Sequence, residues 1–411
     1  MIVIAPTQSG KTTGLAVPAI LEWEGPVLAT SIKTDLVNDT LRRRQQVGEV
    51  RVFDPTAVTR LPSAGWTPVA GCQDWQCARE TAARLCSVAH AGGGLNDADF
   101  WSGAAARYLA PMLFAAAVAG GTITDVLRWI EAEARDELQH LLANHVLAID
   151  DAAELQAAEA ALNALEAVWN ADERLRSSLA ATAGVALDAY GDPTVAGSAQ
   201  RSDITADWLL GGDHTAYLCA TATGQERLRP LFVTLIDQII ARVYQRAAAT
   251  GRPLDPPLLV VLDEAANIAP LPRLDQLAAT GAGQGLQLVT VVQDLAQLEA
   301  RWGRKADTIL NNHRAKLFGS GISCEKTLTY LARVLGDEAI TQASTTRSEH
   351  GRRSRTEATH YRPLGPADRL RQEPPGSGVL LYGHLPPAHI QLRPWYTDHD
   401  LRRLAGSRGP R

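Results

Sequence analysis

The chain has 411 residues, enough for one large or two moderate domains around a buried core. Its 45% hydrophobic and 21% charged residues are ordinary for a soluble globular protein, and its net charge of −5 gives no general attraction to nucleic acid or acidic lipid, although a local basic channel is compatible with it. The five cysteines lack the paired CxxC spacing of a zinc site, which favours reduced thiols in a cytoplasmic protein.

The first segment, residues 1–69, alternates strands and helices. Short apolar runs at Ile2–Ala5, Val27–Ala29 and Val50–Phe53 are typical of strands buried in a parallel sheet. The chain opens on the first of these strands, so we expect no signal peptide. The longest apolar stretch of the chain, Leu109–Gly121, is shorter than the ~20 residues that span a bilayer, so we expect a buried helix there and no transmembrane segment.

The middle segment, residues 70–199, is rich in alanine and poor in strand signals, which predicts an all-α insertion domain. Its apolar residues recur at helical spacing. The expected helices are Ala104–Val118, Ile123–Ala143, Ala152–Asn170 and Leu175–Ala189.

The last segment, residues 200–411, returns to alternating strands and helices. The expected strands are Ala216–Ala220, Leu258–Leu262, Leu286–Val292, Ala315–Ser320 and Val379–Tyr382. The expected helices between them include Arg229–Ala248 and Cys324–Val334. This order predicts an α/β protein with a parallel sheet, in which residues 1–69 and 200–411 form one domain interrupted by the helical insertion.

Two segments near the C-terminus have irregular composition. Gly365–Gly378 is rich in proline and glycine, and we expect it to wrap the surface. Ser344–Arg362 is rich in arginine and histidine, with almost no apolar residues. We interpret it as an exposed loop, and the alternative that it meets phosphate or a partner stays open.

The strongest motif is APTQSGKTT, residues 5–13, which follows the P-loop pattern GxxxxGK[ST] with alanine in place of the first glycine. In such a loop, backbone N–H groups and a helix N-terminus surround the phosphates. Lys11 is predicted to neutralise the β- and γ-phosphates, and Thr12 to bind Mg²⁺. The motif therefore predicts ATP with Mg²⁺ as ligand. The predicted nucleotide-binding residues are Thr7, Gln8, Ser9, Gly10, Lys11, Thr12 and Thr13.

Two further polar groups follow predicted buried strands. Asp263 and Glu264 come directly after Leu258–Leu262, so they are expected at the sheet edge where α/β proteins bind ligands. Asp263 is predicted to hold Mg²⁺, and Glu264 to orient and deprotonate the attacking water. Gln293 follows the next strand and is predicted to sense the γ-phosphate or position the water, unless it only terminates its strand.

Together these residues resemble the type IV coupling proteins, the TraG/TraD-type ATPases of bacterial conjugation. The resemblance covers nearly the whole chain and rests on the following phrases: APTQSGKTT, Ser31-Ile-Lys-Thr-Asp35, Trp66-Thr-Pro68, LLVVLDEAANIAPLPRL, GAGQGLQLVTVVQDLAQL and Ile309-Leu-Asn-Asn-His313. It implies a RecA-like P-loop NTPase with a mainly parallel sheet and an inserted all-α domain that reads the relaxosome. In such proteins Lys11, Thr12, Asp263, Glu264 and Gln293 would match the site residues.

The resemblance also implies how the protein works. It would assemble as a homo-hexamer at the cytoplasmic face of the bacterial membrane. Its partners would be single-stranded DNA with bound relaxase and the channel proteins of a type IV secretion system, and ATP hydrolysis would drive the transfer. Two alternatives stay open: an FtsK/HerA-type DNA pump, which should lack the helical insertion, and a docking module that hydrolyses little ATP.

The chain departs from the family pattern in two places. Family members are usually tethered by N-terminal transmembrane helices, whereas this chain begins at the P-loop strand, so we expect the membrane anchor to lie outside it. Many relatives also carry an arginine in the glycine-rich turn, which here is Gly281-Ala-Gly-Gln-Gly285. Arg273, Arg301 and Arg314 are the candidate replacements, although each is expected to be a surface or structural residue.

Overall fold

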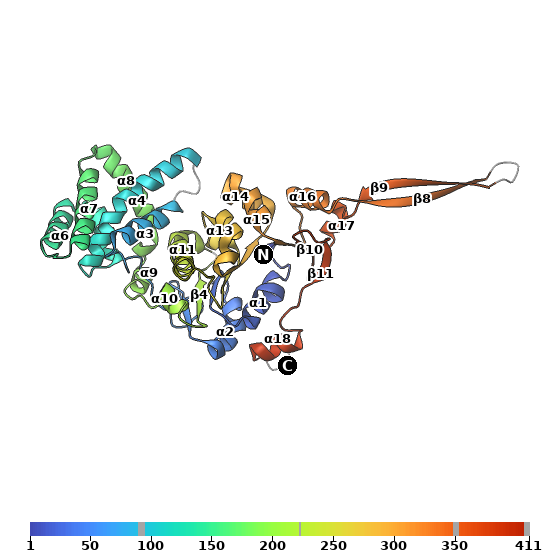
Figure 1. The fold of residues 1–411 in the computed structure, drawn as a ribbon, viewed down its shortest axis with the longest axis horizontal. Coiled ribbons are helices and arrows are strands. Elements are labelled where there is room, and N and C mark those ends of the chain that lie inside the picture. Colours follow the sequence, from blue (N-terminus) through green and yellow to red (C-terminus); the bar gives the residue numbers. More distant parts are fainter. Residues whose placement is uncertain (89–94, 222, 348–352, 407–411) are drawn as a thin grey trace.

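A nine-stranded sheet forms the centre of the molecule in the computed structural model, which describes residues 1–88, 95–221, 223–347 and 353–406 (Figure 1). Its strands are β1 (Ile2–Ile4), β2 (Val27–Ser31), β3 (Val50–Phe53), β4 (Thr215–Cys219), β5 (Leu258–Leu262), β6 (Leu286–Val292), β7 (Ala315–Gly319), β10 (Ser377–Tyr382) and β11 (Ala388–Gln391). The strand order is β11-β10-β7-β1-β6-β5-β2-β4-β3. Strands β1 to β7 pair in parallel, and β10 and β11 extend the sheet in antiparallel fashion, so the predicted mainly parallel sheet is confirmed.

The register of the central strands brings their carboxyl ends to one edge. Ile4 at the end of β1 lies between Val292 of β6 and Phe318 of β7. Leu262 at the end of β5 lies beside Thr290 of β6. The residues that follow β1, β5 and β6 therefore leave the sheet on the same side, where ligands of parallel sheets bind.

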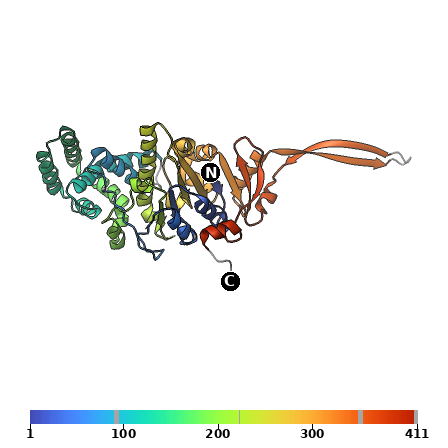
Figure 2. The same ribbon diagram turned by 60° about the horizontal axis from the view of Figure 1, so that its bottom comes forward.

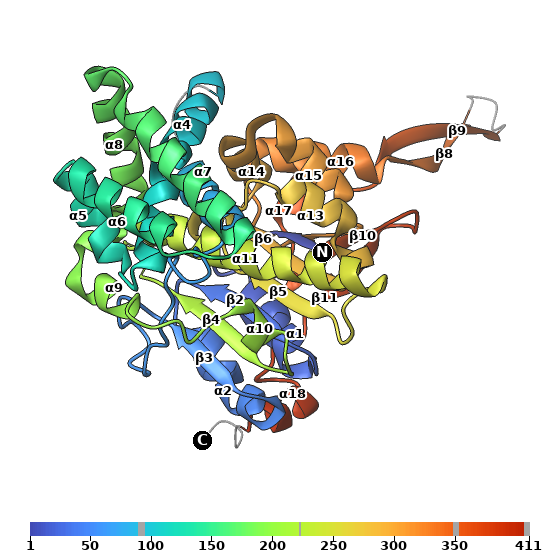
Figure 3. The same ribbon diagram turned by 60° about the vertical axis from the view of Figure 1, so that its left-hand side comes forward.

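Helices cover both faces of the sheet, so successive residues of a central strand are buried on opposite sides. In β5, Val260 packs in the core beneath α11 (Gln225–Thr250), whereas Val261 packs in the core beneath α1 (Val17–Glu22). Figure 3 shows α11 crossing the sheet. The α11 side also holds α12 (Ala265–Ile268), α13 (Leu274–Thr280), α14 (Leu295–Trp302) and α15 (Ala306–Asn312). The α1 side also holds α2 (Asp35–Val47) and α18 (His399–Ala405).

Seven of the eight α-helices described between β3 and β4 gather beyond one end of the sheet, on the left in Figure 1. They are α3 (Trp75–Ser87), α4 (Leu95–Val118), α5 (Ile123–Glu131), α6 (Arg135–Leu147), α7 (Ala152–Trp169), α8 (Glu173–Leu187) and α9 (Pro193–Ser198). The short helix α10 (Ala206–Leu209) leads into β4. Helix α3 joins this group to the sheet part, because Arg84 forms an ion pair of 2.6 Å with Asp237 of α11.

The expected helices differ from the observed ones in three ways. The single helix predicted over Ile123–Ala143 is wrong, because Glu133 has a left-handed backbone with φ of 45° and separates α5 from α6. Helix α3 was not expected. Helix α4 begins nine residues before the predicted Ala104, at Leu95.

The basic segment Ser344–Arg362 is part of a β-hairpin, so its interpretation as a loop is wrong. Strand β8 (Asp337–Arg347) pairs with β9 (Arg353–Pro363) in antiparallel register. The hairpin projects far from the body of the molecule (Figure 2). Both faces of the hairpin carry mostly polar residues. Its sequence therefore lacks the alternation of apolar and polar residues that predicts a half-buried strand. His350 and Arg352 lie outside the described residues.

The segment Gly365–Gly378 is less irregular than expected. It contains the short helix α17 (Ala367–Arg371), which contacts α16 (Glu325–Leu335), and it ends at the start of β10. Strand β11, which completes the sheet edge, was not expected.

Candidate nucleotide-binding site

The P-loop is fixed to the carboxyl edge of the sheet. The Ala5 backbone N–H donates to the Val292 carbonyl oxygen at 3.0 Å, which ties the start of the loop to β6. Gln8 and Gly10 have φ of 64° and 82°, the left-handed region that lets the chain turn back on itself. The chain then enters the helical turn η1 (Thr12–Ala16), which continues into α1. The predicted order of strand, loop and helix is therefore present, and the helix begins directly where the loop ends.

Side chains of the loop divide into exposed and buried ones. Thr7 and Gln8 are exposed at the turn, and the Thr13 hydroxyl donates to the Gly10 carbonyl oxygen at 3.4 Å. Ser9 is buried, and its hydroxyl has no hydrogen-bond partner within the described part of the chain. A buried hydroxyl without a partner beside a turn of backbone N–H groups suits an anionic ligand with several acceptor oxygens.

Lys11 lies inside the loop, with only 6% of its surface exposed. Its ammonium group donates to the Pro6 carbonyl oxygen at 3.1 Å, a contact that a phosphate oxygen could replace. Burial lowers the pKa of Lys11, whereas the carboxylates of Asp263 and Glu264 raise it and Lys33 lowers it again. The buried ammonium therefore faces two acids and a second cation, Lys33, which sequence reasoning did not assign to the site.

Thr12 and Asp263 form the contact expected of a magnesium site. The Thr12 hydroxyl donates to Oδ2 of Asp263 at 3.2 Å. Asp263 is buried, and its second oxygen, Oδ1, has no hydrogen-bond partner among the described residues. Burial raises the pKa of Asp263 to about 6, against the opposing effects of Lys11 and Thr12. A carboxylate with a free buried oxygen beside a hydroxyl fits Mg²⁺, which prefers oxygen ligands.

Glu264 has a strained backbone and an engaged carboxylate. Its φ and ψ are 60° and 50°, a left-handed conformation that is uncommon for a residue other than glycine. Its Oε2 accepts a hydrogen bond from the side-chain amide of Asn267 at 3.0 Å. Asn267 is therefore a site residue that sequence reasoning missed. Its place three residues after Glu264 was the available signal, although asparagine has no distinctive pattern.

Gln293 lies at the same edge, directly after β6. Its backbone N–H donates to Oε1 of Gln297 at 2.8 Å. The next residue, Asp294, caps α14 by accepting from the Gln297 N–H at 2.7 Å. No hydrogen bond within the described residues involves the Gln293 side-chain amide. The structure thus places Gln293 beside the P-loop strand, with its amide available to a ligand.

His313, from the phrase at 309–313, lies in the core rather than at the site. Its ring contacts the Thr290 hydroxyl at 3.2 Å and the Ile309 carbonyl oxygen at 2.7 Å. Burial lowers the pKa of His313 to about 4, so the ring is neutral near pH 7. It connects α15 to β6 as a structural group.

The three candidate arginines differ in their surroundings. Arg273 donates to Asp237 at 2.9 Å, and Arg314 lies over the Tyr382 ring at 4.9 Å. Both are therefore engaged within this chain. Arg301 has no hydrogen bond or ion pair in the part of the chain that the structure describes, and it lines a cavity on the α11 side.

Comparison with known proteins identifies the family. The family described as Type IV secretory system Conjugative DNA transfer matches residues 1–407. The chain is 24% identical over 417 residues to the protein VirD4 of Rhizobium rhizogenes, covering 98% of this chain and 59% of that protein. It is 25% identical over 404 residues to the conjugal transfer protein TraG of Escherichia coli, covering 91% of this chain and 61% of that protein. The chain therefore spans less than two thirds of these relatives.

Solved structures share the fold. The unbound monoclinic form of the bacterial conjugative coupling protein TrwB superimposes with a TM-score of 0.69 at 16% identity, covering 95% of this chain and 84% of that one. The TrwB complex with ADP and Mg²⁺ gives a TM-score of 0.65 at 18% identity, covering 96% and 85%. Among the helices of the described residues, none combines the length and hydrophobicity that a membrane crossing needs. The RecA-like P-loop fold and the family match together show that this chain belongs to the type IV secretory system conjugative DNA transfer family.

Proposed function

We propose that the chain is the ATP-hydrolysing motor of a conjugative coupling protein, which recruits a relaxase–DNA complex and drives the DNA through a type IV secretion channel. The observation that carries the proposal is the gathering of Lys11, Thr12, Asp263 and Glu264 at one sheet edge. The family match supports the transfer role, and it disfavours an FtsK/HerA-type pump.

The residues divide the chemistry among themselves as follows. Backbone N–H groups of residues 7–13 surround the phosphates, and Lys11 neutralises their charge. Thr12 and Asp263 would hold Mg²⁺, which would supply positive charge to the phosphate oxygens.

Glu264 accepts the proton of the attacking water, and Gln293 positions that water. To accept this proton, the Glu264 carboxylate must exchange its hydrogen bond with Asn267 for one with the water. The strained backbone at Glu264 supports the assignment, because such strain gathers at functional sites.

Assembly and location follow from the family and are part of the same proposal. The working form would be a homo-hexamer at the cytoplasmic face of the bacterial membrane. Residues 70–199 would form the all-α domain that meets the relaxosome, and residues 1–69 and 200–411 the nucleotide-binding domain. The helices from α3 to α9 support this division.

A docking module with little hydrolysis is the second candidate. It is favoured by one observation, that the glycine-rich turn Gly281-Ala-Gly-Gln-Gly285 carries no arginine that could reach a neighbour's nucleotide. ATP turnover separates the two functions, because only the motor hydrolyses ATP in proportion to the DNA supplied.

The first test is ATP binding and turnover in the Lys11→Ala variant. We expect both to be lost, because the buried ammonium that faces the phosphates disappears. Lys326→Ala serves as the control, since that lysine is about half exposed on α16 and pairs with Glu299. Parent-level turnover in Lys11→Ala would remove the P-loop from the mechanism.

A further inference from the structure

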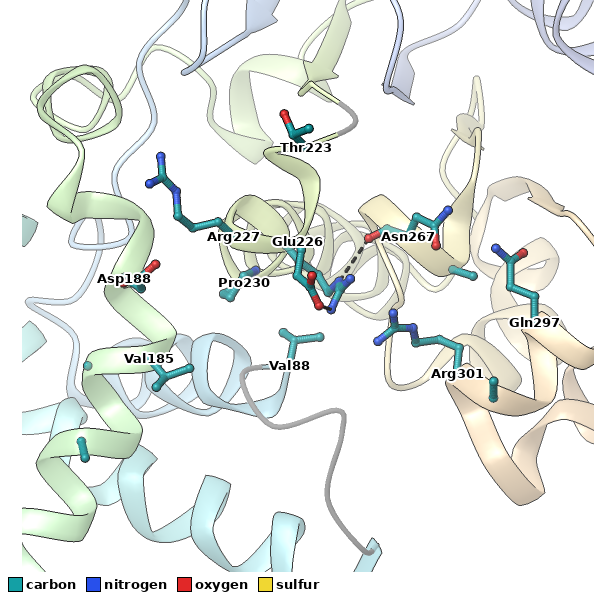
Figure 4. Close-up of a pocket in the computed structure, with 15 residues that line it drawn as sticks. Val88, Val185, Asp188, Thr223, Glu226, Arg227, Pro230, Asn267, Gln297 and Arg301 are labelled. Atoms are coloured by element: carbon teal, nitrogen blue, oxygen red, sulfur yellow. Dashed lines mark hydrogen bonds and ion pairs between the residues drawn. The ribbon is translucent and has the colours of Figure 1, made fainter. Parts of the chain in front are cut away.

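A large cavity separates the helical group from the motor core beside the nucleotide site. It has a volume of about 970 Å³ and opens between α8 on one side and α11, α12 and α14 on the other. Figure 4 shows Val185 and Asp188 on one wall, and Asn267, Gln297 and Arg301 on the opposite wall. The cavity therefore has contributions from the insertion and from the motor.

Two arginines in this cavity lack adequate acidic partners. The Arg229 side chain is 9% exposed, and its nearest carboxylate is Glu226, at 3.8 Å, whose side chain is 84% exposed. Burial lowers the pKa of Arg229, and the charge of Arg301 lowers it further. Burial also lowers the pKa of Arg301. Arg301 is half-buried, so the buried guanidinium of Arg229 lies close to a second cation, an arrangement that an anion between them would stabilise.

Hydrogen bonds connect two residues that line the cavity to the candidate catalytic residues Glu264 and Gln293. Asn267 accepts from Nε of Arg229 through its backbone carbonyl oxygen at 3.1 Å, while its side-chain amide holds Glu264 at 3.0 Å. Gln297, on the same wall, accepts from the Gln293 backbone N–H at 2.8 Å. A ligand at the arginines is thus two hydrogen bonds away from the Glu264 carboxylate.

We propose that Arg229 and Arg301 bind a backbone phosphate of single-stranded nucleic acid, and that this contact controls Glu264 through Asn267. The proposal rests on the proposed function and adds the place where the strand and the hydrolysis site communicate. A phosphate that draws the Arg229 guanidinium away from the Asn267 carbonyl loosens Asn267, which then releases the Glu264 carboxylate to the water.

The lining of the cavity favours a phosphate over a base. Guanidinium groups match phosphate oxygens in charge and planar geometry. No aromatic residue lines the cavity among the described residues, so it offers no platform on which bases stack. Small residues leave room for a sugar–phosphate chain, and they are Ala181, Gly184, Ala266 and Ala300. Such a site holds the strand without reading its sequence.

Arg301→Ala in the whole chain tests the binding step, because Arg301 supports no described internal contact and its loss spares the fold. The probe is a fluorescein-labelled oligo(dT), followed by anisotropy over a range of salt. We expect the affinity to fall about tenfold. The slope of log affinity against log salt should become shallower by about 0.7, the value for one lost phosphate contact. Arg304→Ala is the control, since it removes an exposed arginine nearby and should bind as the parent does.

The coupling step is tested by ATP turnover with and without oligo(dT). Arg301→Ala should keep basal turnover and lose the DNA stimulation. Asn267→Ala should keep the affinity for oligo(dT) while its stimulated and basal rates become equal. If Arg301→Ala binds oligo(dT) as tightly as Arg304→Ala, or is stimulated as strongly, the inference is wrong. If the parent hydrolyses no ATP under any condition, the proposed function fails, while the anisotropy series still decides whether the cavity binds the strand.

Discussion

The Glu264 carboxylate is restrained twice, by its left-handed backbone and by the Asn267 amide. A non-glycine residue in this conformation costs roughly 1–3 kcal/mol, which the surrounding helix α12 and strand β5 must offset. The restraint fixes where the carboxylate lies, and the Asn267 hydrogen bond engages one of its oxygens. The inferred control of Glu264 through Asn267 depends on this restraint.

Fixed local spacing made part of this site predictable. Lys11 and Thr12 belong to one loop. Asp263 follows a strand whose unbroken apolar run predicts that the strand is buried. Lys33 was beyond prediction from sequence, because its proximity to the site depends on where the whole sheet places β2. Asn267 lies only three residues from Glu264, but asparagine at that spacing has no distinctive pattern. The catalytic and binding roles of the predicted residues stay predictions that the mutations here test.

Protonation of His313 should destabilise the fold in acid. The unfolded histidine titrates near 6.5 and the folded one at about 4, so the unfolded state binds more protons between these values. Stability from this group is therefore complete above pH 6.5 and falls as the pH drops toward 4, by roughly 3 kcal/mol in total. Asp263 acts in the opposite direction, since its pKa is raised to about 6.

The measurement compares urea unfolding of the parent and His313→Gln at several pH values, so that the Asp263 contribution is common to both. The loss of stability in acid should be smaller in His313→Gln. Equal pH dependence in the two proteins would mean that His313 is not the buried neutral group described above.

Among the elements, the joint between α3 and α11 connects the helical insertion to the sheet part. Arg84 and Arg273 both donate to Asp237, whose side chain is only 9% exposed. The hydrophobic periods of α3 and α11 do not reveal this contact, because an ion pair between distant elements leaves no local pattern. The same limit applies to the β8–β9 hairpin, whose strands lack an apolar face.

Asp237→Ala should destabilise the protein by about 2 kcal/mol, because it removes the buried carboxylate that accepts from both arginines and leaves Arg84, which is 14% exposed, with Glu80 alone. Asp207→Ala is the matched control. Asp207 also pairs with two arginines, Arg242 and Arg246, but its side chain is 63% exposed, so its loss should cost about 1 kcal/mol or less. The midpoint of urea unfolding measures both. Equal losses would show that the joint is not a buried ion pair.

At the scale of the whole molecule, a cavity lies between the helical insertion and the part of the molecule that holds the nine-stranded sheet. Parallel sheet and insertion were predictable from the alternation of apolar runs and the alanine-rich middle segment. Assembly was not, because the chain lacks the arginine of the glycine-rich turn, Gly281-Ala-Gly-Gln-Gly285.

Specific ATPase activity should rise with protein concentration or with added single-stranded DNA. Mass action favours a ring when subunits are crowded, and DNA contacts add a salt-sensitive contribution. We expect a mostly monomeric protein in dilute solution, measured by light scattering alongside turnover at low and high salt. A flat activity from a species that remains monomeric would mean that the site works alone.

The motor proposal depends above all on Glu264 as the group that accepts the proton of the attacking water. Glu264→Gln keeps the shape of the side chain and removes its basicity, so ATP binding should persist while turnover falls by roughly 10²- to 10⁴-fold. Glu299→Gln, an exposed acid on α14, should leave both unchanged. Single-stranded DNA is present throughout, and binding and turnover are measured on the same samples. Retained binding with lost turnover is the predicted result, and turnover at the parent rate in Glu264→Gln would contradict the proposed mechanism.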